Sequence, residues 1–425
     1  MKEQVKSSTF MLRIVNLAWK NIWRNKLRSG VILGAITIGL FAGTFMISSM
    51  SGWILGTVIS DIETQFSHIQ IHDTAFRANS DIKAYFISRD VARNVSALTH
   101  NVSTLTHNAP ILITYRLNLT GMLASPYQVI GVNAKGVSVD EEKQVTTVWK
   151  QIPDSLGAFL PDDSRLGIVI SRKIADKLKV KLRSKVVFTF QDVHGDMRSI
   201  AFRVCGIYKT TNGMFDETNV MMRYDDLFHY TGLPPGAVHE AAILLPDLET
   251  CKTVAPQLKQ MFPDMDVQDW TELNPALSMA MAYTDFMAVV MLAIFLLALS
   301  FGIINTMLMA VLERTHELAM LGAIGMSKGK IFSMIMLETV FLTLLGSIVG
   351  IILGIAVITP LLETGIDLSF FIEDQFEDFG FSSIIYPVLH IKMITEILVL
   401  VILTGIMSAI YPARKALKRT LMNIL

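Results

Sequence analysis

The sequence predicts an α-helical membrane protein with four transmembrane helices and a large α+β extracytoplasmic domain between helices 1 and 2. Charged residues make up 17% of the 425 residues, whereas about a quarter is usual in soluble domains. The mean hydropathy is +0.47, and the apolar residues gather in four long runs. A mixed segment of 223 residues, 61–283, separates the first run from the second.

The four apolar runs have the length of membrane spans. A helix needs about 20 apolar residues to cross the hydrocarbon core. Residues 29–60 form a run of 32 without a charge, residues 286–312 a run of 27, and residues 339–362 a run of 24. The fourth run, 397–413, has only 17 residues. It reaches a comfortable length only with the apolar residues that precede Glu396.

Lysine and arginine near the span ends predict the orientation, because they are enriched on the cytoplasmic side. Seven precede the first run, three lie in 313–330, and four lie in the tail, which has no acid. The loop 363–391 holds six acids and no basic residue. Both termini and 313–330 are therefore expected in the cytoplasm, and no nucleic-acid partner is expected. The predicted segments are 1–28, a cytoplasmic amphipathic helix; 29–57, transmembrane helix 1; 58–283, the extracytoplasmic (periplasmic) domain; 284–312, transmembrane helix 2; 313–330, a cytoplasmic helix; 331–360, transmembrane helix 3; 361–390, an acidic external loop; 391–413, transmembrane helix 4; and 414–425, a basic cytoplasmic tail.

The external segment alternates strand-like and helix-like patterns. Residues 68–72 alternate between isoleucine and polar side chains, which predicts a strand with His68, Gln70 and His72 on a polar outer face. A hairpin is predicted from strands 186–191 and 199–208. Cys205 and Cys251 allow a disulfide in an oxidising exterior, and the alternative for Cys205 is a small buried residue in a strand. Further strands are expected at 111–119, 129–132 and 167–170, and helices at 171–178 and 251–261.

The sequence offers little catalytic chemistry. His68 and His72 would share one face of a strand, but no third or fourth metal ligand clusters near them. Residues 322–330 contain glycine and lysine without the spacing of a phosphate-binding loop. No serine-hydrolase or zinc-protease motif is present either. The chain is therefore expected to bind no metal or cofactor and to be no enzyme.

Residues 313–330 combine charges, glycines and a helical apolar pattern between two predicted spans. Glu313, Arg314 and Glu317 fall within one turn of one another. Apolar residues recur three apart in the same segment, which predicts a short amphipathic helix. Leu318, Leu321 and Ile324 are expected to seat this helix against spans 2 and 3.

Small and charged residues in the spans suggest packing and function. Gly30 and Gly34, and likewise Gly346, Gly350 and Gly354, are four apart, a spacing that lets membrane helices approach closely. The interface would lie within the chain or between subunits, and the alternative is that glycine is simply common in membrane helices.

Two charged features near the cytoplasmic side remain open. Glu338 lies two turns into span 3, where an acid is either functional or reaches back to the interface. Residues 10–28 are basic and contain Trp19 and Trp23, as in a helix at the membrane surface. The same residues would also serve as a simple positive anchor for the topology.

Four stretches resemble the FtsX/MacB/LolC-type permeases. Residues 17–29 look like the N-terminal helix of these proteins, and residues 411–416, with Tyr411 and Pro412, look like their C-terminal end. Residues 67–72 resemble the start of the external domain in the lipoprotein-release branch. The most specific stretch is 313–327, and the resemblance identifies its ATPase-coupling residues as Glu313, Arg314, Glu317, Leu318, Leu321, Gly325 and Met326.

The resemblance implies a membrane subunit of an ABC transporter that works by mechanotransmission. A separate cytoplasmic ABC ATPase dimer would bind ATP and Mg²⁺, and a second permease chain, identical or different, would complete the unit in the bacterial inner membrane. Membrane lipids, a lipoprotein and a periplasmic carrier are the other expected partners. The branch implies lipoprotein release towards the outer membrane. The alternatives are an FtsX-like regulator of a cell-wall hydrolase and a MacB-like efflux permease for another amphiphile. By resemblance, the substrate path would include Phe41, Phe45, Met46, Met287 and Met291.

Overall fold

The computed structural model of the chain falls into two compact units. One unit consists of residues 1–53, 282–366 and 385–425, and the other of residues 54–281 and 367–384. Expectations for the first 14 residues and for most of the acidic loop fall outside the described residues. The structure describes residues 15–24, 26–93, 95, 111–162, 164–368, 384–389 and 391–422.

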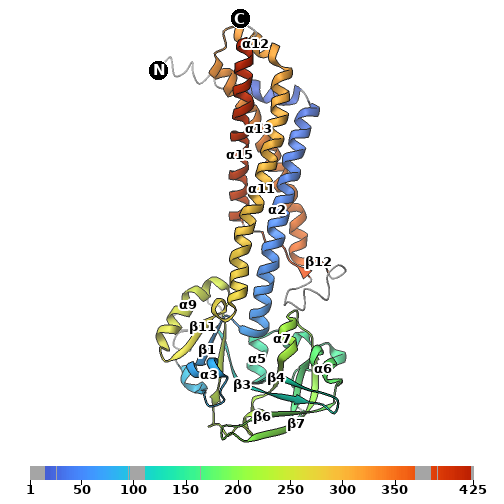
Figure 1. Cartoon of the computed structure of the whole chain (residues 1–425), viewed down its shortest axis with the longest axis vertical. Helices are drawn as coiled ribbons and strands as arrows, with labels where there is room; N and C mark the ends of the chain where they lie inside the picture. Colours follow the sequence, from blue (N-terminus) through green and yellow to red (C-terminus); the bar gives the residue numbers. More distant parts are fainter. Residues whose placement is uncertain are drawn as a thin grey trace. The chain divides into compact units, whose positions relative to one another are not determined.

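The first unit is helical (Figure 1). Its four long helices are the ones with the length and composition to cross a membrane, which confirms the prediction of four transmembrane helices. All four continue past the predicted spans, because polar residues at either end extend the helix beyond the apolar run. The helices are α2 (Lys26–Asp61), α11 (Pro275–Glu313), α13 (Lys328–Thr364) and α15 (Ile391–Met422), joined by a short α12 (Thr315–Ala323) and preceded by a helix at 15–24.

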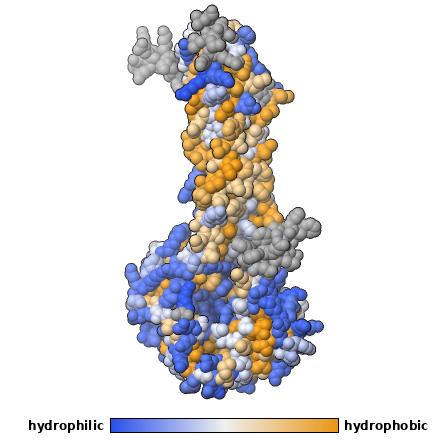
Figure 2. Space-filling view, viewed as in Figure 1, coloured by the Kyte–Doolittle hydropathy of each residue, from blue (hydrophilic) through white to orange (hydrophobic). Residues whose placement is uncertain are grey.

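Helix α13 packs against two other long helices of this unit. A Cβ added at Gly350 would lie 2.9 Å from the Leu40 side chain of α2, and one at Gly405 of α15 would lie 2.5 Å from Thr343 of α13. Contacts this close require glycine on one side. The outer sides of the helices remain apolar, as Figure 2 shows, and α11 in particular exposes Val289, Leu297 and Phe301. Such surfaces suit a lipid environment.

The second unit is an α+β domain, as predicted, and its nine-stranded sheet has the order β11-β1-β10-β3-β4-β8-β5-β7-β6. Its strands are β1 (Ile69–Asp73), β3 (Leu112–Ala124), β4 (Val129–Val137), β5 (Gly167–Ser171), β6 (Lys185–Gln191), β7 (Met197–Tyr208), β8 (Asn219–Arg223), β10 (Glu240–Leu244) and β11 (Met265–Asp269), with β2 (Phe86–Ile87) paired to β9 (Ala237–Val238) and β12 (Ile366–Asp367) paired to β13 (Ile384–Ile385). Its helices are α3 (Thr74–Asn79), α5 (Val139–Val145), α6 (Arg172–Leu178), α7 (Gly213–Thr218), α8 (Tyr224–Phe228), α9 (Leu248–Met261) and α10 (Trp270–Leu273), with single turns at Ile62–Phe66, Val148–Gln151 and Asp154–Leu156.

The second unit has two lobes, and strand β3 is long enough to contribute residues to both. Its first residues pair with β10, and its last three, Met122 to Ala124, pair with β6. The strands β3-β4-β8-β5-β7-β6 therefore close on themselves around a core of Phe188, Phe202 and Val204. The predicted hairpin is confirmed, because β6 and β7 pair antiparallel from Lys185 to Arg203.

The other lobe combines β11, β1 and β10 with α9 (Figure 1). The expected polar outer face of β1 is wrong, because His68, Gln70 and His72 are all buried. Strand β1 lies between two neighbouring strands, and both of its faces are covered. His72 Nδ1 bonds to the His239 carbonyl oxygen (2.8 Å), and its Nε2 bonds to Gln70 Oε1 (3.0 Å). The Leu245 amide donates to His68 Nδ1 (3.1 Å).

The two cysteines are both free thiols. Cys251 lies in α9 and is buried in the core of the β1 lobe. Cys205 lies in β7 and is half-buried against the closed strands. The disulfide that the sequence allowed is therefore absent from the structure, and Cys205 is a small, half-buried strand residue as in the alternative.

A buried ion cluster lies on β3 and its neighbours. Arg116 is fully buried and donates to Glu142 of α5 (3.0 Å) and to Glu240 of β10. Burial alone would raise the pKa of Glu240, but the charges of Arg116 and Lys135 hold it at about 2. Such a cluster is costly to break, because removing one member leaves another buried and unpaired.

Candidate functional site

Helix α12 connects the long helices α11 and α13 through two tight turns. Its nine residues are followed by Ile324 and then by Gly325, whose φ of +98° is a conformation that other residues rarely adopt. The Met326 amide then donates to the Leu321 carbonyl oxygen (3.0 Å), which closes the turn before α13. The segment expected as one helix, 313–330, is therefore a shorter helix and a sharp reversal of the chain.

One apolar side chain anchors α12 to the helical unit. Leu318 is 2% exposed in a core that includes residues of α13 and α15, and Leu321 is half-buried beside it. Ile324 is 77% exposed, so its predicted packing is wrong. The helix ends one residue earlier, and Ile324 follows it as the C-cap. Leu318 lies beside Met307 of α11 and Met334 of α13 in the wall of one small cavity, so its expected seat on spans 2 and 3 is confirmed. Helix α12 also lies against α15, a contact with span 4 that the sequence did not predict.

Four charged side chains from three helices form a continuous chain of ion pairs around α12. Glu317 accepts hydrogen bonds from Arg24 of the N-terminal helix and from Arg314 (3.1 Å). Arg314 also pairs with Glu338 of α13, 3.3 Å away. Glu338, which the sequence left open between two roles, is thus a partner of Arg314. The chain links residues 293 positions apart in the sequence.

The ion pairs differ in their shielding from solvent. The side chains of Arg24 and Glu317 are about half exposed, so their pair contributes at most about 1 kcal/mol. Arg314 and Glu338 have side chains only 17% and 12% exposed, so water screens their attraction less. Hydrogen bonds from Arg24 and then Arg314 lower the pKa of Glu317, and Glu317 stays ionised near neutral pH.

The N-terminal helix at 15–24 packs on this unit. Ala18 and Ile22 are buried in the same core as Leu318. Ser29 Oγ donates to the Ile22 carbonyl oxygen (2.6 Å), and the Trp19 ring meets Phe341 of α13 edge-on at 5.8 Å between centroids. Arg24 is therefore held where it can reach Glu317.

The residues expected to couple to a partner occupy different positions. Glu313 is exposed, whereas Arg314 is turned inward to Glu338. Met320 and Ile324 were not selected as contact residues from the sequence, yet both are strongly exposed on or directly after α12. The only feature of the sequence that could have indicated them is that both are apolar residues on the side of the helix opposite Leu318. Arg24 was also missed, because nothing local links it to a helix almost 300 residues away.

The expected substrate-path residues lie in the helical unit. Phe41 and Phe45 of α2 stack at 6.0 Å between ring centroids. Met46 is partly exposed, and Met287 and Met291 of α11 are half-buried. A separate apolar cavity of about 250 Å³ lies between α2 and α11, with Gly39 and Phe295 in its wall. Its walls contain none of these five residues.

The predicted glycine packing divides into two groups. Gly346, Gly350 and Gly354 face α2, where an added Cβ would meet Ile36, Leu40 and Thr44 within 2.9 Å. Gly30 and Gly34 have open space at the same position. The first group packs helices within the chain, and the second does not.

A comparison with known families and proteins finds a family match and relatives along most of the chain. Residues 289–421 match the family described as FtsX-like permease C-terminal. An uncharacterized ABC transporter permease of Methanocaldococcus jannaschii is 26% identical over 304 residues, 66% of this chain and 71% of that protein. The lipoprotein-releasing system transmembrane protein LolC of Neisseria meningitidis is 21% identical over 349 residues, 76% of this chain and 75% of LolC.

Other matches are shorter or weaker. The macrolide export ATP-binding/permease protein MacB of Chlorobaculum tepidum is 46% identical over 56 residues, 13% of this chain and 9% of MacB. The extracellular domain of the noncanonic ABC-type transporter YknZ from Gram-positive bacteria matches 48% of this chain and 99% of that domain. That match has 12% identity and a TM-score of 0.31, and the periplasmic region of MacB from Actinobacillus actinomycetemcomitans has a TM-score of 0.32.

Proposed function

Residues 289–421 form an FtsX-like permease domain, and from this premise we propose that the chain couples a separate ATPase to movement of an amphiphilic substrate. The chain is a multi-pass ABC transporter permease of the FtsX/MacB/LolC type. The observation that supports the coupling role is the chain of ion pairs from Arg24 through Glu317 and Arg314 to Glu338. A displacement of α12 is passed through it to the N-terminal helix and to α13.

The proposed partner is a cytoplasmic ABC ATPase dimer that binds ATP and Mg²⁺. It would press on α12, where Met320, Ile324 and Glu313 are exposed. Apolar side chains surrounded by polar ones are a usual feature of a protein contact. Both termini and α12 would then lie in the cytoplasm, as the basic residues at the span ends favour.

Movement would reach the extracytoplasmic domain through α2 and α11. Each helix contributes residues to both compact units. An α-helix resists compression because each turn is hydrogen-bonded to the next. At about 1.5 Å per residue, α2 is roughly 54 Å long, longer than the hydrocarbon core of about 30 Å. A second permease chain would complete the transporter, and the path along Phe41, Phe45, Met46, Met287 and Met291 remains a proposal.

The proposed substrate is a lipoprotein, which is released from the inner membrane and passed to a periplasmic carrier. The match to LolC supports it, because that match extends over three quarters of both chains. Matches to MacB support a second candidate, export of another amphiphile. They reach 46% identity but cover a small part of MacB. A third outcome is an FtsX-like regulator that moves no substrate.

The ATPase contact is tested by purifying the full chain from its own cells and measuring the ABC ATPase that co-purifies with it. Ile324→Asp should reduce the bound ATPase at least fivefold, because it places a charge on the proposed contact. Met197→Asp is the matched control, since Met197 is also a strongly exposed apolar residue but lies on β7. Equal retention of the ATPase by both variants would refute the contact.

The substrate is tested by depleting the chain in its own cells. Lipoproteins trapped in the inner membrane would support lipoprotein release. Normal lipoprotein sorting with increased sensitivity to amphiphilic drugs would support export instead. Normal sorting with unseparated cells would support the regulator.

A further inference from the structure

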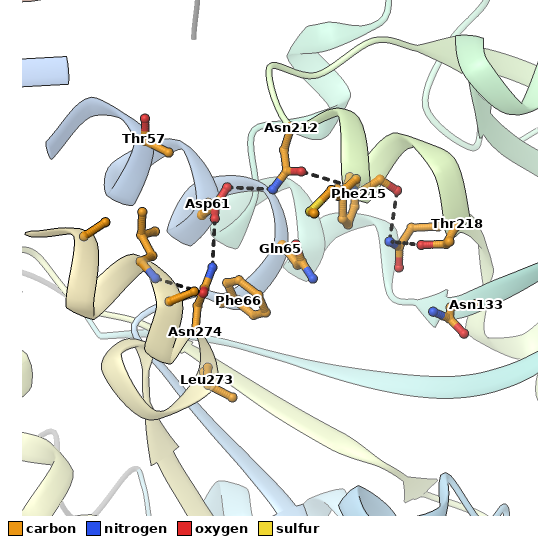
Figure 3. Close-up of a pocket in the computed structure, with 15 residues that line it drawn as sticks. Thr57, Asp61, Gln65, Phe66, Asn133, Asn212, Phe215, Thr218, Leu273 and Asn274 are labelled. Carbon is orange, nitrogen blue, oxygen red and sulfur yellow. Dashed lines mark hydrogen bonds between the residues drawn. The ribbon is translucent and has the colours of Figure 1, made fainter. Parts of the chain in front are cut away.

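A cavity of about 480 Å³ lies entirely within the second unit, and its walls contain one charged residue, Asp61. Figure 3 shows the Asp61 carboxylate between the side-chain amides of Asn212 and Asn274. Asn212 Nδ2 donates to Asp61 Oδ1 (2.7 Å), and Asn274 Nδ2 donates to Asp61 Oδ2 (3.4 Å). The cavity lies in the size range of small-molecule sites, about 300–1,000 Å³.

Both amides are held in place by the helices that they cap. The Phe215 amide of α7 donates to Asn212 Oδ1 (3.0 Å), and the Leu277 amide of α11 donates to Asn274 Oδ1 (3.1 Å). Each amide oxygen is thereby used, and the NH₂ group turns to Asp61. Asp61 therefore receives two neutral donors in fixed positions.

Among the residues that the structure describes, no cation compensates Asp61 in this cavity. Its side chain is 5% exposed, and none of the lining residues is lysine, arginine or histidine. A buried carboxylate without a cation is unfavourable. A carboxylate offers about four lone-pair positions, and the two amides use only part of them. Lys135 lines an adjoining cavity, and its Nζ lies 5.6 Å from the ring centre of Phe215 and 3.5 Å from the Gln65 carbonyl oxygen. Its charge acts on the cluster of Glu240, Arg116 and Glu142, and it is not among the charges that shift the pKa of Asp61.

The remaining walls are apolar or neutral. Phe66, Met214, Phe215, Leu273 and Leu277 provide the apolar part. The glutamine, threonine and asparagine side chains of the walls carry no charge. The site thus offers one negative charge beside an apolar surface.

We propose that this cavity binds an organic monocation, with an ammonium group at Asp61 and an apolar body against Phe66, Phe215 and Leu273. Charge complementarity favours a cation over a neutral molecule or an anion. A metal ion fits less well, because both asparagine oxygens already accept helix N–H groups and leave few oxygen ligands. The ammonium instead donates hydrogen bonds to the free positions of the carboxylate.

The test uses the full chain in lipid nanodiscs without ATP or ATPase, so that its result is independent of the proposed coupling. Isothermal titration compares 4-phenylbutylamine with 4-phenylbutanol and 4-phenylbutyrate, which share the apolar body, and empty nanodiscs correct for partitioning. The amine should bind saturably and at least tenfold more tightly than the other two. Equal binding of all three compounds would overturn the proposal.

Two pairs of variants locate the site. Asp61→Asn should weaken amine binding at least tenfold. Asp192→Asn should change it less than twofold, because Asp192 is also a buried carboxylate of the second unit but does not line the cavity. Met214→Lys supplies a competing ammonium at the cavity wall and should weaken binding, whereas the neutral Met214→Gln should not. Unchanged amine binding in folded Asp61→Asn, or equal effects of the two Met214 variants, would overturn the proposal even if the other pair failed to fold.

Discussion

At the scale of single residues, Glu317 links helix α12 to the neighbouring helices through ion pairs. It accepts hydrogen bonds from Arg24 and Arg314, and Arg314 reaches Glu338. An exposed ion pair adds little to the free energy of unfolding. The main effect of these pairs is therefore on the orientation of α12. The charges hold α12 in one orientation relative to the helices beside it.

Exchange of the charges at Arg24 and Glu317 tests this role. Glu317→Arg should reduce stimulation of the partner ATPase at least about threefold, because it repels Arg24 and Arg314. The double variant Arg24→Glu/Glu317→Arg should recover most of the activity, measured as phosphate release in nanodiscs. A direct contact between Glu317 and the ATPase predicts the opposite, no recovery. Glu249→Lys, on the exposed side of α9, is the control.

His68 makes the β1 lobe sensitive to acid. Burial lowers the pKa of His68 to about 4 from 6.5. The unfolded lobe therefore binds a proton between these values that the folded lobe does not, so stability falls as pH decreases from about 6.5 to 4. Since one pKa unit corresponds to about 1.36 kcal/mol, the loss is on the order of 3 kcal/mol. His68→Gln should weaken this dependence, and buried His72 and His239, whose pKa values burial also lowers, should retain the rest.

Cys251 provides the measurement. It is buried in the same lobe, and its Sγ lies 3.5 Å from the His68 carbonyl oxygen. In a Cys205→Ser background, labelling of Cys251 by 4,4′-dithiodipyridine reports opening of the lobe, also at acid pH. The rate should rise more steeply with acid in the parent than in His68→Gln. An identical pH dependence in the two proteins would contradict the assignment to His68.

At the scale of elements, the glycines of α13 decide how closely it packs against α2. Gly346, Gly350 and Gly354 are four apart and form one stripe on the helix. Side chains of α2 fill the space that a Cβ would need. In lipid, close packing of this kind replaces the hydrophobic drive that is missing between helices.

Alanine substitutions separate the two groups of glycines. Gly350→Ala should destabilise the helical unit by about 1–3 kcal/mol through overpacking against Leu40 and Thr37. Gly34→Ala should be neutral or slightly stabilising within one chain, because nothing lies within 4 Å and alanine favours helix. Thermal unfolding in detergent measures both. Equal destabilisation by the two substitutions would contradict the packing, unless Gly34 meets a second chain.

At the scale of the whole molecule, the distribution of basic residues in the sequence predicts that α12 and the second unit lie on opposite sides of a membrane. Lysine and arginine gather around 313–330 and the tail, whereas the second unit follows the first span. The helices α2 and α11 connect this unit to the spans. A cytoplasmic ATPase would then act on α12 while any external substrate meets the other unit.

Single cysteines test this orientation in a Cys205→Ser/Cys251→Ser background. Asp264→Cys lies at an exposed position after α9, and His316→Cys lies at an exposed position of α12. A membrane-impermeant maleimide should label the first variant in spheroplasts, and the second only after the membrane is opened. The reverse pattern would invert the proposed topology.

The sequence by itself determined the four long apolar helices, the α+β domain between the first two of them and the β6–β7 hairpin. These features follow from the length of the apolar runs and from the periodicity of apolar residues, and both are properties of short stretches of sequence. Tertiary structure alone decided that His68, Gln70 and His72 are buried, that Ile324 is exposed, and that Arg24 pairs with Glu317. It also selected Gly350 over Gly34 for close packing and placed Asp61 between Asn212 and Asn274. The physical reason is that burial and charge pairing depend on segments far apart in the chain, so no local pattern records them.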